Sequence, residues 1–72
     1  MQYMFADNIK QFKEKNNLTF RELAKTLKVS YAILEQLVNK KREKARLDII
    51  CRVAEGLDVE IDDLLFTNIY SN

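Results

Sequence analysis

A short basic stretch is the part of the sequence best suited to binding a phosphate-bearing partner. Five cations fall within seven residues, at Lys40, Lys41, Arg42, Lys44 and Arg46. Residues 1–46 hold eleven Lys and Arg against five Asp and Glu, whereas residues 47–72 hold one against six, so the chain has a basic and an acidic half. Such a stretch can bind a polyanion and can equally be a solvated loop, and the charges alone leave both interpretations open.

Catalytic and metal-binding chemistry is disfavoured by the residue types that the chain lacks. It has no histidine and one cysteine, so the commonest base, the commonest metal ligand and an internal disulfide are all missing. The adjacent acids Asp62 and Asp63 point about 100° apart on a helix, which suits a helix N-terminus better than an acid–base pair. We therefore expect no enzyme activity, no cofactor and no metal, and we interpret Cys51 as a small core residue.

The elements that position these residues are predicted to be helices throughout. There is no proline and a single glycine, and apolar residues recur at spacings of three and four. Seventy-two residues with 47% apolar content suffice for one domain over residues 1–72, with a core at about 5–66 and a C-terminal tail at 67–72. Because no apolar run could span a membrane and the start lacks the order of a signal peptide, we expect a cytoplasmic protein without membrane contact.

The first two helices have clear local signals. The first is predicted from roughly Met4 to Lys15 and should end at Asn16-Asn17, because asparagine tolerates the left-handed conformation at a helix C-terminus. Thr19 followed three residues later by Glu22 is a capping box, in which each side chain accepts a backbone N–H of the other residue. A second helix therefore begins at Phe20.

Three more helices follow from apolar spacing. Ser30 is a natural N-cap for a third helix from Tyr31 to about Asn39. The fourth and fifth helices are predicted from the stripes Leu47, Ile50, Cys51, Val53, Ala54 and Leu57, and Ile61, Leu64 and Leu65. The inward faces of the second and third helices are predicted to be Leu23, Ala24 and Leu27, and Leu34, Leu37 and Val38, respectively. This leaves a polar outer face on the third helix.

Two short helices joined by a three-residue turn, with a basic loop after the second, form the layout of a helix-turn-helix. The segments LTFRELAKTLKVSYAILEQLVNKKR and ARLDIICRVAEGLDVEIDDLL resemble the helix-turn-helix domain of phage repressors and Cro proteins, of the xenobiotic response element type. The resemblance covers about residues 5–66. It implies an all-α, compact five-helix, lambda-repressor-like DNA-binding domain.

The resemblance implies that the third helix lies in the major groove of duplex DNA. The positions that read bases would be Tyr31, Ala32, Ile33, Glu35 and Gln36. Glutamine can pair with adenine, glutamate can accept from cytosine, and the apolar side chains can pack on a thymine methyl group. Without the resemblance, these would be ordinary solvent-facing helix residues.

Phosphate contacts would come from the residues that flank this helix. The expected set is Thr19, Phe20, Arg21, Lys28, Ser30, Asn39, Lys41, Arg42, Lys44 and Arg46, with the backbone N–H groups of 19–21 taking part. Each phosphate neutralised steepens the salt dependence of binding by ~0.9 in logarithmic slope. Strong salt dependence is therefore expected.

The sequence departs from the family pattern at several positions near this surface. Lys28 stands where the turn usually has glycine, so it must accept a positive φ or change the turn. Phe20 stands where relatives often have glutamine. Lys13 is present on the first helix, but the residue that would be its usual glutamate partner is Val38, so that ion pair cannot form.

The family resemblance favours a sequence-specific transcriptional repressor that binds a two-fold related operator as a homodimer. The candidate dimer surface is Leu65, Phe66, Ile69 and Tyr70, although Ile69 and Tyr70 could instead seal the core. The alternative function is a protein-binding module of the same fold, an antitoxin or anti-repressor, that uses its acidic end on a protein partner.

Overall fold

The computed structural model describes residues 3–39 and 45–70. Its five helices are α1 (Phe5–Lys15), α2 (Phe20–Leu27), α3 (Tyr31–Asn39), α4 (Leu47–Leu57) and α5 (Ile61–Phe66). No strand occurs within the two described ranges. The predicted all-helical class is confirmed, and each helix starts within one residue of the position expected from the sequence.

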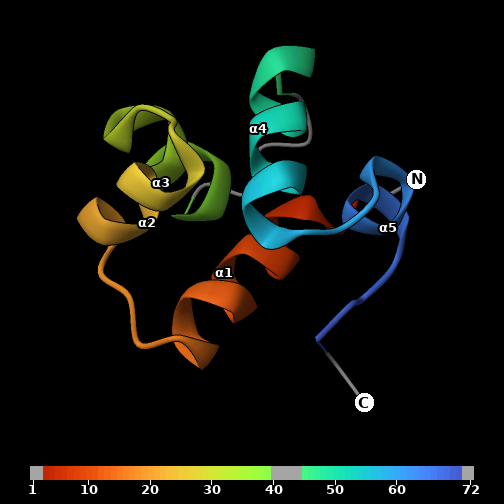
Figure 1. Cartoon of the computed structure of the whole chain (residues 1–72), viewed down its shortest axis with the longest axis horizontal. Helices are drawn as coiled ribbons and strands as arrows, with labels where there is room; N and C mark the ends of the chain where they lie inside the picture. The colour runs from red at the N-terminus through yellow and green to blue at the C-terminus, as the bar shows by residue number, and fades with distance from the viewer. Residues whose placement is uncertain (1–2, 40–44, 71–72) are drawn as a thin grey trace.

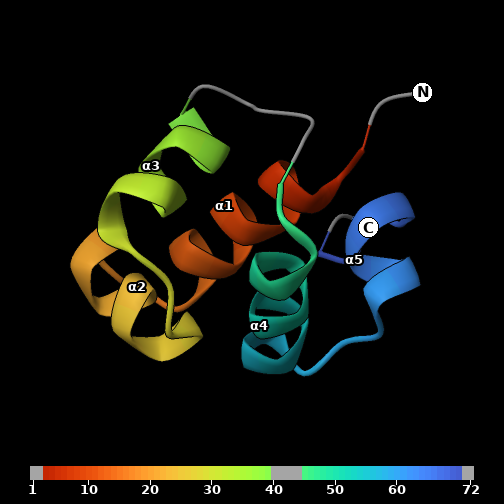
Figure 2. The same cartoon turned by 90° about the horizontal axis from the view of Figure 1, so that it is seen from above.

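Helix α1 lies across the middle of the molecule, with α2 and α3 on one side of it and α4 and α5 on the other (Figures 1 and 2). It packs against α3 and α5, while α2 packs against both α3 and α4, and α4 packs against α5. Helices α2 and α3 therefore form an angled pair at one edge of the fold.

The core is built from the inward faces of all five helices. The buried faces predicted for α2 and α3 are confirmed, whereas the stripe predicted for α4 is partly wrong. Leu47 is 70% exposed and Ile49 is buried, because residues two apart on a helix point about 200° from each other and both cannot face the core. Cys51 is half-buried rather than part of the core cluster.

The glycine of α4 is required by a close approach to α2. A Cβ atom at Gly56 would collide with Cδ2 of Leu27 and would lie 3.4 Å from its Cα. Leu27 is itself only 1% exposed, so it has little room to move aside. The spacing of α2 from α4, and with it the placement of the α2–α3 pair, depends on the missing side chain.

A buried asparagine ties the two ends of the chain together. Asn8 is 0% exposed. Its Nδ2 donates to the carbonyl oxygens of Leu64 and Thr67, both at 2.8 Å, and its Oδ1 accepts from the backbone N–H of Ile69 at 3.2 Å. A buried amide needs such partners, and here they fix α1 to α5 and to the segment that follows it.

Three helices end at residues in the left-handed region. Asn17, Lys28 and Asp58 have φ values of 54°, 58° and 58°. After α2, the N–H of Val29 donates to Ala24 at 3.1 Å, and after α4 the N–H of Val59 donates to Ala54 at 3.0 Å. Both are Schellman motifs. Of the two outcomes expected at Lys28, a positive φ or a changed turn, the structure shows the positive φ.

Candidate nucleic-acid interface

The start of α2 is fixed by the predicted capping box. The N–H of Glu22 donates to Oγ1 of Thr19 at 3.1 Å, and the N–H of Thr19 donates to Oε1 of Glu22 at 2.9 Å. The hydrogen bonds from the backbone and then the side chain of Thr19 lower the pKa of the Glu22 carboxyl below its usual value of 4.5. The expectation that the Thr19 N–H is free for a phosphate is corrected, because this N–H donates to the Glu22 carboxylate. The Thr19 hydroxyl also belongs to the box, since it accepts from the Glu22 N–H.

The turn between α2 and α3 brings two of the predicted phosphate-contact residues to the surface. Lys28 and Ser30 are exposed, while Val29 between them is buried. The carbonyl of Lys28 accepts from Nη1 of Arg52 at 3.3 Å, and the carbonyl of Ser30 accepts from the N–H of Leu34 at 3.0 Å, in the first turn of α3. Asn39, at the other end of α3, is also exposed.

Helix α3 turns its apolar face to α1 and α2 and leaves its opposite face uncovered. Tyr31 is 42% and Ile33 37% exposed. Ala32 is exposed, and Glu35 and Gln36 are half-buried. All five predicted base-reading side chains are thus at least partly accessible, on a helix that packs on α1 and α2 rather than being enclosed by α4.

An aromatic pair flanked by two cations joins three helices at this surface. The rings of Phe20 and Tyr31 meet edge to face, with centroids 6.4 Å apart and planes at 87°. Nζ of Lys13 lies 4.8 Å from the centroid of the Phe20 ring, and Cζ of Arg21 lies 5.3 Å from that of Tyr31. We call these four residues the outer aromatic cluster. Sequence reasoning did not include Lys13 in the site; its missing ion-pair partner, together with an aromatic residue at the start of α2, was the available signal.

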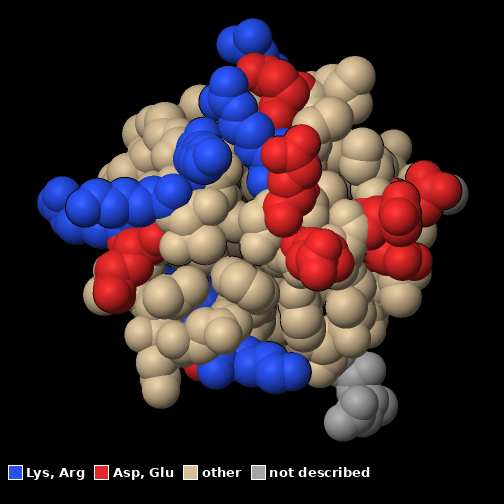
Figure 3. All heavy atoms as spheres, viewed as in Figure 1, with Lys and Arg blue, Asp and Glu red and all other residues tan. Residues whose placement is uncertain are grey.

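The charges are distributed unevenly over the surface. Figure 3 shows Lys and Arg gathered at the edge formed by α2 and α3 and at the top, and Asp and Glu gathered at the α4–α5 side. Arg46 precedes α4 and its side chain is 82% exposed, with an ion pair to Asp48 at 3.3 Å, which in water holds it weakly. Lys40, Lys41, Arg42 and Lys44 lie outside the described residues.

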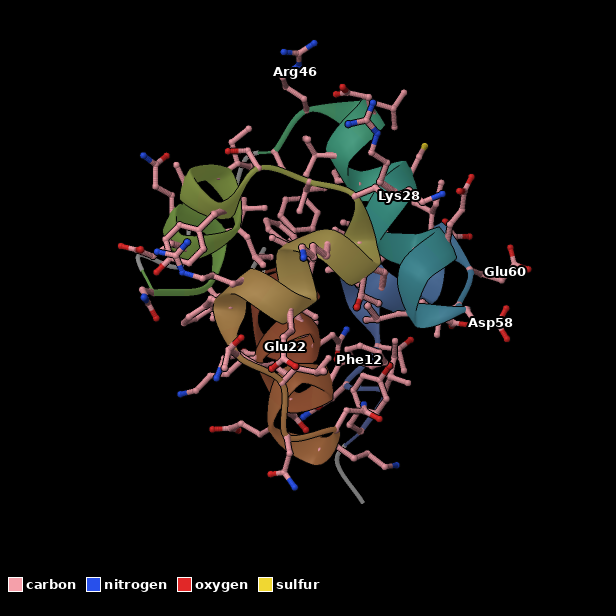
Figure 4. The ribbon with its side chains drawn as sticks, turned by 60° about the vertical axis from the view of Figure 1, so that its left-hand side comes forward. Phe12, Glu22, Lys28, Arg46, Asp58 and Glu60 are labelled. Atoms are coloured by element: carbon pink, nitrogen blue, oxygen red, sulfur yellow. The ribbon has the colours of Figure 1, made fainter. Side chains whose placement is uncertain are left out.

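The acidic side has its own surface feature. Asp58 and Glu60 project from the connection between α4 and α5, below Lys28 on the same side of the view and far from Arg46 at the top (Figure 4). They border an open groove of about 520 Å³ whose other lining residues are Cys51, Ala54, Glu55, Val59, Ile61 and Asp63. Carboxylates repel DNA phosphates, so this side is unsuited to the duplex.

The four dimer candidates differ in what they contact. The Tyr70 ring packs on Phe12, with centroids 6.2 Å apart, and burial raises the pKa of its phenol. The N–H of Ile69 is held by Asn8. These contacts are the ones expected of residues that seal the core. Phe66 is 52% exposed beside Tyr3, at 5.7 Å between ring centroids, and Leu65 is half-buried.

Some kinds of site have no counterpart in the described parts of the chain. Within residues 3–39 and 45–70, no three His, Cys, Asp or Glu side chains come together as a metal site requires. None of the helices described has the length and apolar character needed to cross a membrane.

The accessible α3, entered through a tight turn from α2 and flanked by cations, defines a helix-turn-helix domain, since an α-helix fits the major groove of B-DNA. The model of the Cro/C1-type HTH DNA-binding domain matches residues 8–68. The chain therefore belongs to the Cro/C1-type helix-turn-helix family of DNA-binding domains.

A solved structure of similar fold supports this architecture. A transcriptional regulator from Listeria innocua superposes with a TM-score of 0.73 at 22% sequence identity, over 100% of this chain. The chain spans 64% of the length of that regulator. Comparison with curated protein sequences gives no significant match.

Proposed function

We propose that the protein is a sequence-specific duplex-DNA-binding repressor that acts as a homodimer on a two-fold related operator. The observation that carries this proposal is the uncovered outer face of α3, where Tyr31, Ile33 and Gln36 are accessible on a helix anchored from behind. A single small module makes few base contacts, so two copies on half-sites about 34 Å apart would supply affinity and specificity together.

The base contacts follow from the side-chain chemistry of α3. Gln36 would donate to and accept from an adenine edge, and Glu35 would accept from a cytosine amino group. Ala32 and Ile33 would pack on a thymine methyl group, and Tyr31 would contribute its hydroxyl to a base edge or a phosphate.

The phosphate contacts would come from groups on both sides of α3. Arg21, Lys28, Ser30, Asn39 and Arg46 are exposed in the described structure, and Lys41, Arg42 and Lys44 belong to the same proposed set. The capping box takes the backbone N–H groups of Thr19 and Glu22, so those of Phe20 and Arg21 would be the ones to favour an anion at the start of α2.

Selection of duplex DNA from a random pool tests the proposal. We expect a consensus with two-fold symmetry, about tenfold weaker binding by Gln36→Ala, and a salt slope reduced by about 0.9 in Arg21→Ala. Gln11→Ala is the matched control for Gln36, because Gln11 is also a half-buried glutamine but lies on α1 and bonds to Asn68. Failure to enrich any sequence would contradict sequence-specific binding.

The dimer is tested at its exposed candidate. Phe66→Glu should shift sedimentation from dimer to monomer, because a charge would replace an exposed ring. Removing residues 67–72 is a poorer test, because it would also remove the partners of Asn8. An unchanged dimer in Phe66→Glu would place the interface elsewhere.

A second candidate function, protein binding through the acidic end, is favoured by the groove between α4 and α5. Its lining combines apolar side chains with four carboxylates, a composition that fits a partner segment that carries cations. Tight binding to a protein, lost in a double variant Asp58→Asn and Glu60→Gln, with no affinity for duplex DNA, would support this function over the first.

A further inference from the structure

We propose that Phe20 is a positioning residue for DNA recognition, which holds Tyr31 and through it Arg21 in the orientation that meets the duplex. This inference rests on the proposed function. It starts from a departure from the family pattern, because an apolar ring occupies the first position of α2 where a polar side chain is usual.

The outer aromatic cluster is placed where the two helices of the motif start. Phe20 is the first residue of α2 and Tyr31 the first residue of α3, so their edge-to-face contact sets one helix start against the other. Phe20 is half-buried while Tyr31 is 42% exposed. The ring that reaches solvent is therefore supported by a ring that is anchored, and Lys13 covers that anchor from α1 at 4.8 Å.

Pre-ordering of Tyr31 and Arg21 would favour binding. A long or aromatic side chain that is free in solution must be immobilised on the duplex, whereas one already held has less conformational freedom to lose. Arg21 lies over the Tyr31 ring at 5.3 Å. A guanidinium above a ring is held by its charge, which leaves N–H groups for a phosphate. Loss of the Phe20 ring would release Tyr31 first and Arg21 with it.

The test compares two variants of the wild type. Phe20→Leu keeps an apolar side chain but removes the ring, whereas Phe20→Tyr keeps the ring. Phe12→Leu is the matched control, since Phe12 is also half-buried and packs on a tyrosine, but on the side away from α3. We expect Phe20→Leu to weaken specific binding about three- to tenfold and to relax base preference at one position per half-site. Phe20→Tyr should keep the wild-type affinity and base preference, and Phe12→Leu should change neither in the folded protein.

A double-variant cycle with Tyr31→Ala separates positioning from direct contact. If Phe20 acts through Tyr31, Phe20→Leu should have little further effect on affinity in a Tyr31→Ala background. The ring-current shifts of the Tyr31 protons in the free protein should also disappear in Phe20→Leu. Two results would overturn this inference while leaving the proposed function intact. One is a double variant whose loss of DNA affinity equals the product of the two single losses, and the other is an unchanged base preference in Phe20→Leu. A wild-type protein that selects no sequence would overturn both.

Discussion

Among the Phe–Tyr pairs in the described part of the chain, two have a lysine over one of the rings, and these two lie at different places in the fold. In the outer aromatic cluster, Phe20 meets Tyr31 and the cations of Lys13 and Arg21 lie over the rings. In the second pair, Phe12 meets Tyr70, and Nζ of Lys15 lies 5.6 Å from the centroid of Tyr70. We call this second pair, with Lys15, the inner pair.

What differs is the structure around each pair. The inner pair lies beside the Asn8 hydrogen bonds, which hold residues 64–69 against α1, so its rings close the fold. The outer aromatic cluster lies at two helix starts, and the Tyr31 side chain there is 42% exposed. The same residue types thus stabilise the fold at one place and remain available to a partner at the other, and variants should separate the two roles.

Asn8→Ala should give the largest effect, on the side of the inner pair. The carbonyls of Leu64 and Thr67 would lose their side-chain donor in a buried setting, at a cost of about 3 kcal/mol in the free energy of unfolding. Denaturant unfolding checks this. Asn16→Ala is the control, because Nδ2 of Asn16 bonds to the Phe12 carbonyl at 2.9 Å in an exposed position. Equal losses for the two variants would contradict the role given to Asn8.

Thr19→Ala should have the next largest effect, on the side of the outer aromatic cluster. It removes the acceptor of the Glu22 N–H and should lower the free energy of unfolding by about 1 kcal/mol. Thr26→Ala is the control, since its hydroxyl donates to the Glu22 carbonyl within α2 and alanine favours a helix interior. If the midpoint temperature of thermal unfolding were no lower for Thr19→Ala than for Thr26→Ala, the stabilising role given to the Thr19 N-cap would be contradicted.

Lys28→Gly should stabilise the protein slightly without disturbing either pair. The left-handed conformation disfavours a side chain with a Cβ, and glycine removes that cost but is freer in the unfolded chain, so a net gain of about 0.5–1 kcal/mol is expected. Asp58→Gly, at the equivalent end of α4, should gain less because aspartate tolerates this conformation better. A larger gain at Asp58 would reverse the argument.

The free energy of unfolding at acidic pH should depend on Glu22 at the start of α2. Because the pKa of Glu22 is lowered in the folded protein, its contribution is present above the unfolded value of 4.5 and is lost as the pH falls through the folded pKa. Glu22→Gln should therefore flatten the acid end of a plot of stability against pH. In a Thr19→Ala background the same substitution should flatten it somewhat less, because the smaller, side-chain cause of the lowered pKa has gone while the backbone N–H of residue 19 still donates to the carboxylate.

The alkaline limb should report on the inner pair, and its effect is the smallest. Burial raises the pKa of the Tyr70 phenol from 10.0, so its contribution is present below that value and is lost as the pH rises through the folded pKa. Tyr70→Phe should remove this loss. The ultraviolet titration curves of the wild type and of Tyr70→Phe differ by the ionisation of the Tyr70 phenol. If that difference gave the ordinary pKa of 10.0, it would contradict the burial of this side chain.

The features predicted from sequence were those fixed by neighbours along the chain. The Thr19–Glu22 box spans four consecutive residues. The positive φ at Lys28 was one of two outcomes expected because that turn usually holds a glycine. Leu47 was wrongly assigned to the core. Leu47 and Ile49 are both apolar and lie at the start of α4, so the apolar pattern alone does not decide which of the two faces the core. Asn8 was missed because its partners lie 56 to 61 residues away. The contact of Lys13 with Phe20 depends on how α1 meets α2, which no local pattern specifies.

The Asn8 hydrogen bonds also bear on how the protein is made. Asn8 leaves the ribosome early, while its partners at 64, 67 and 69 leave late, and contacts so distant in sequence are slow to close. Until Ile69 has emerged from the exit tunnel, α1 lacks these bonds and the support of α5. A nascent chain arrested before that point should therefore stay sensitive to protease even though α2 and α3 have already been synthesised.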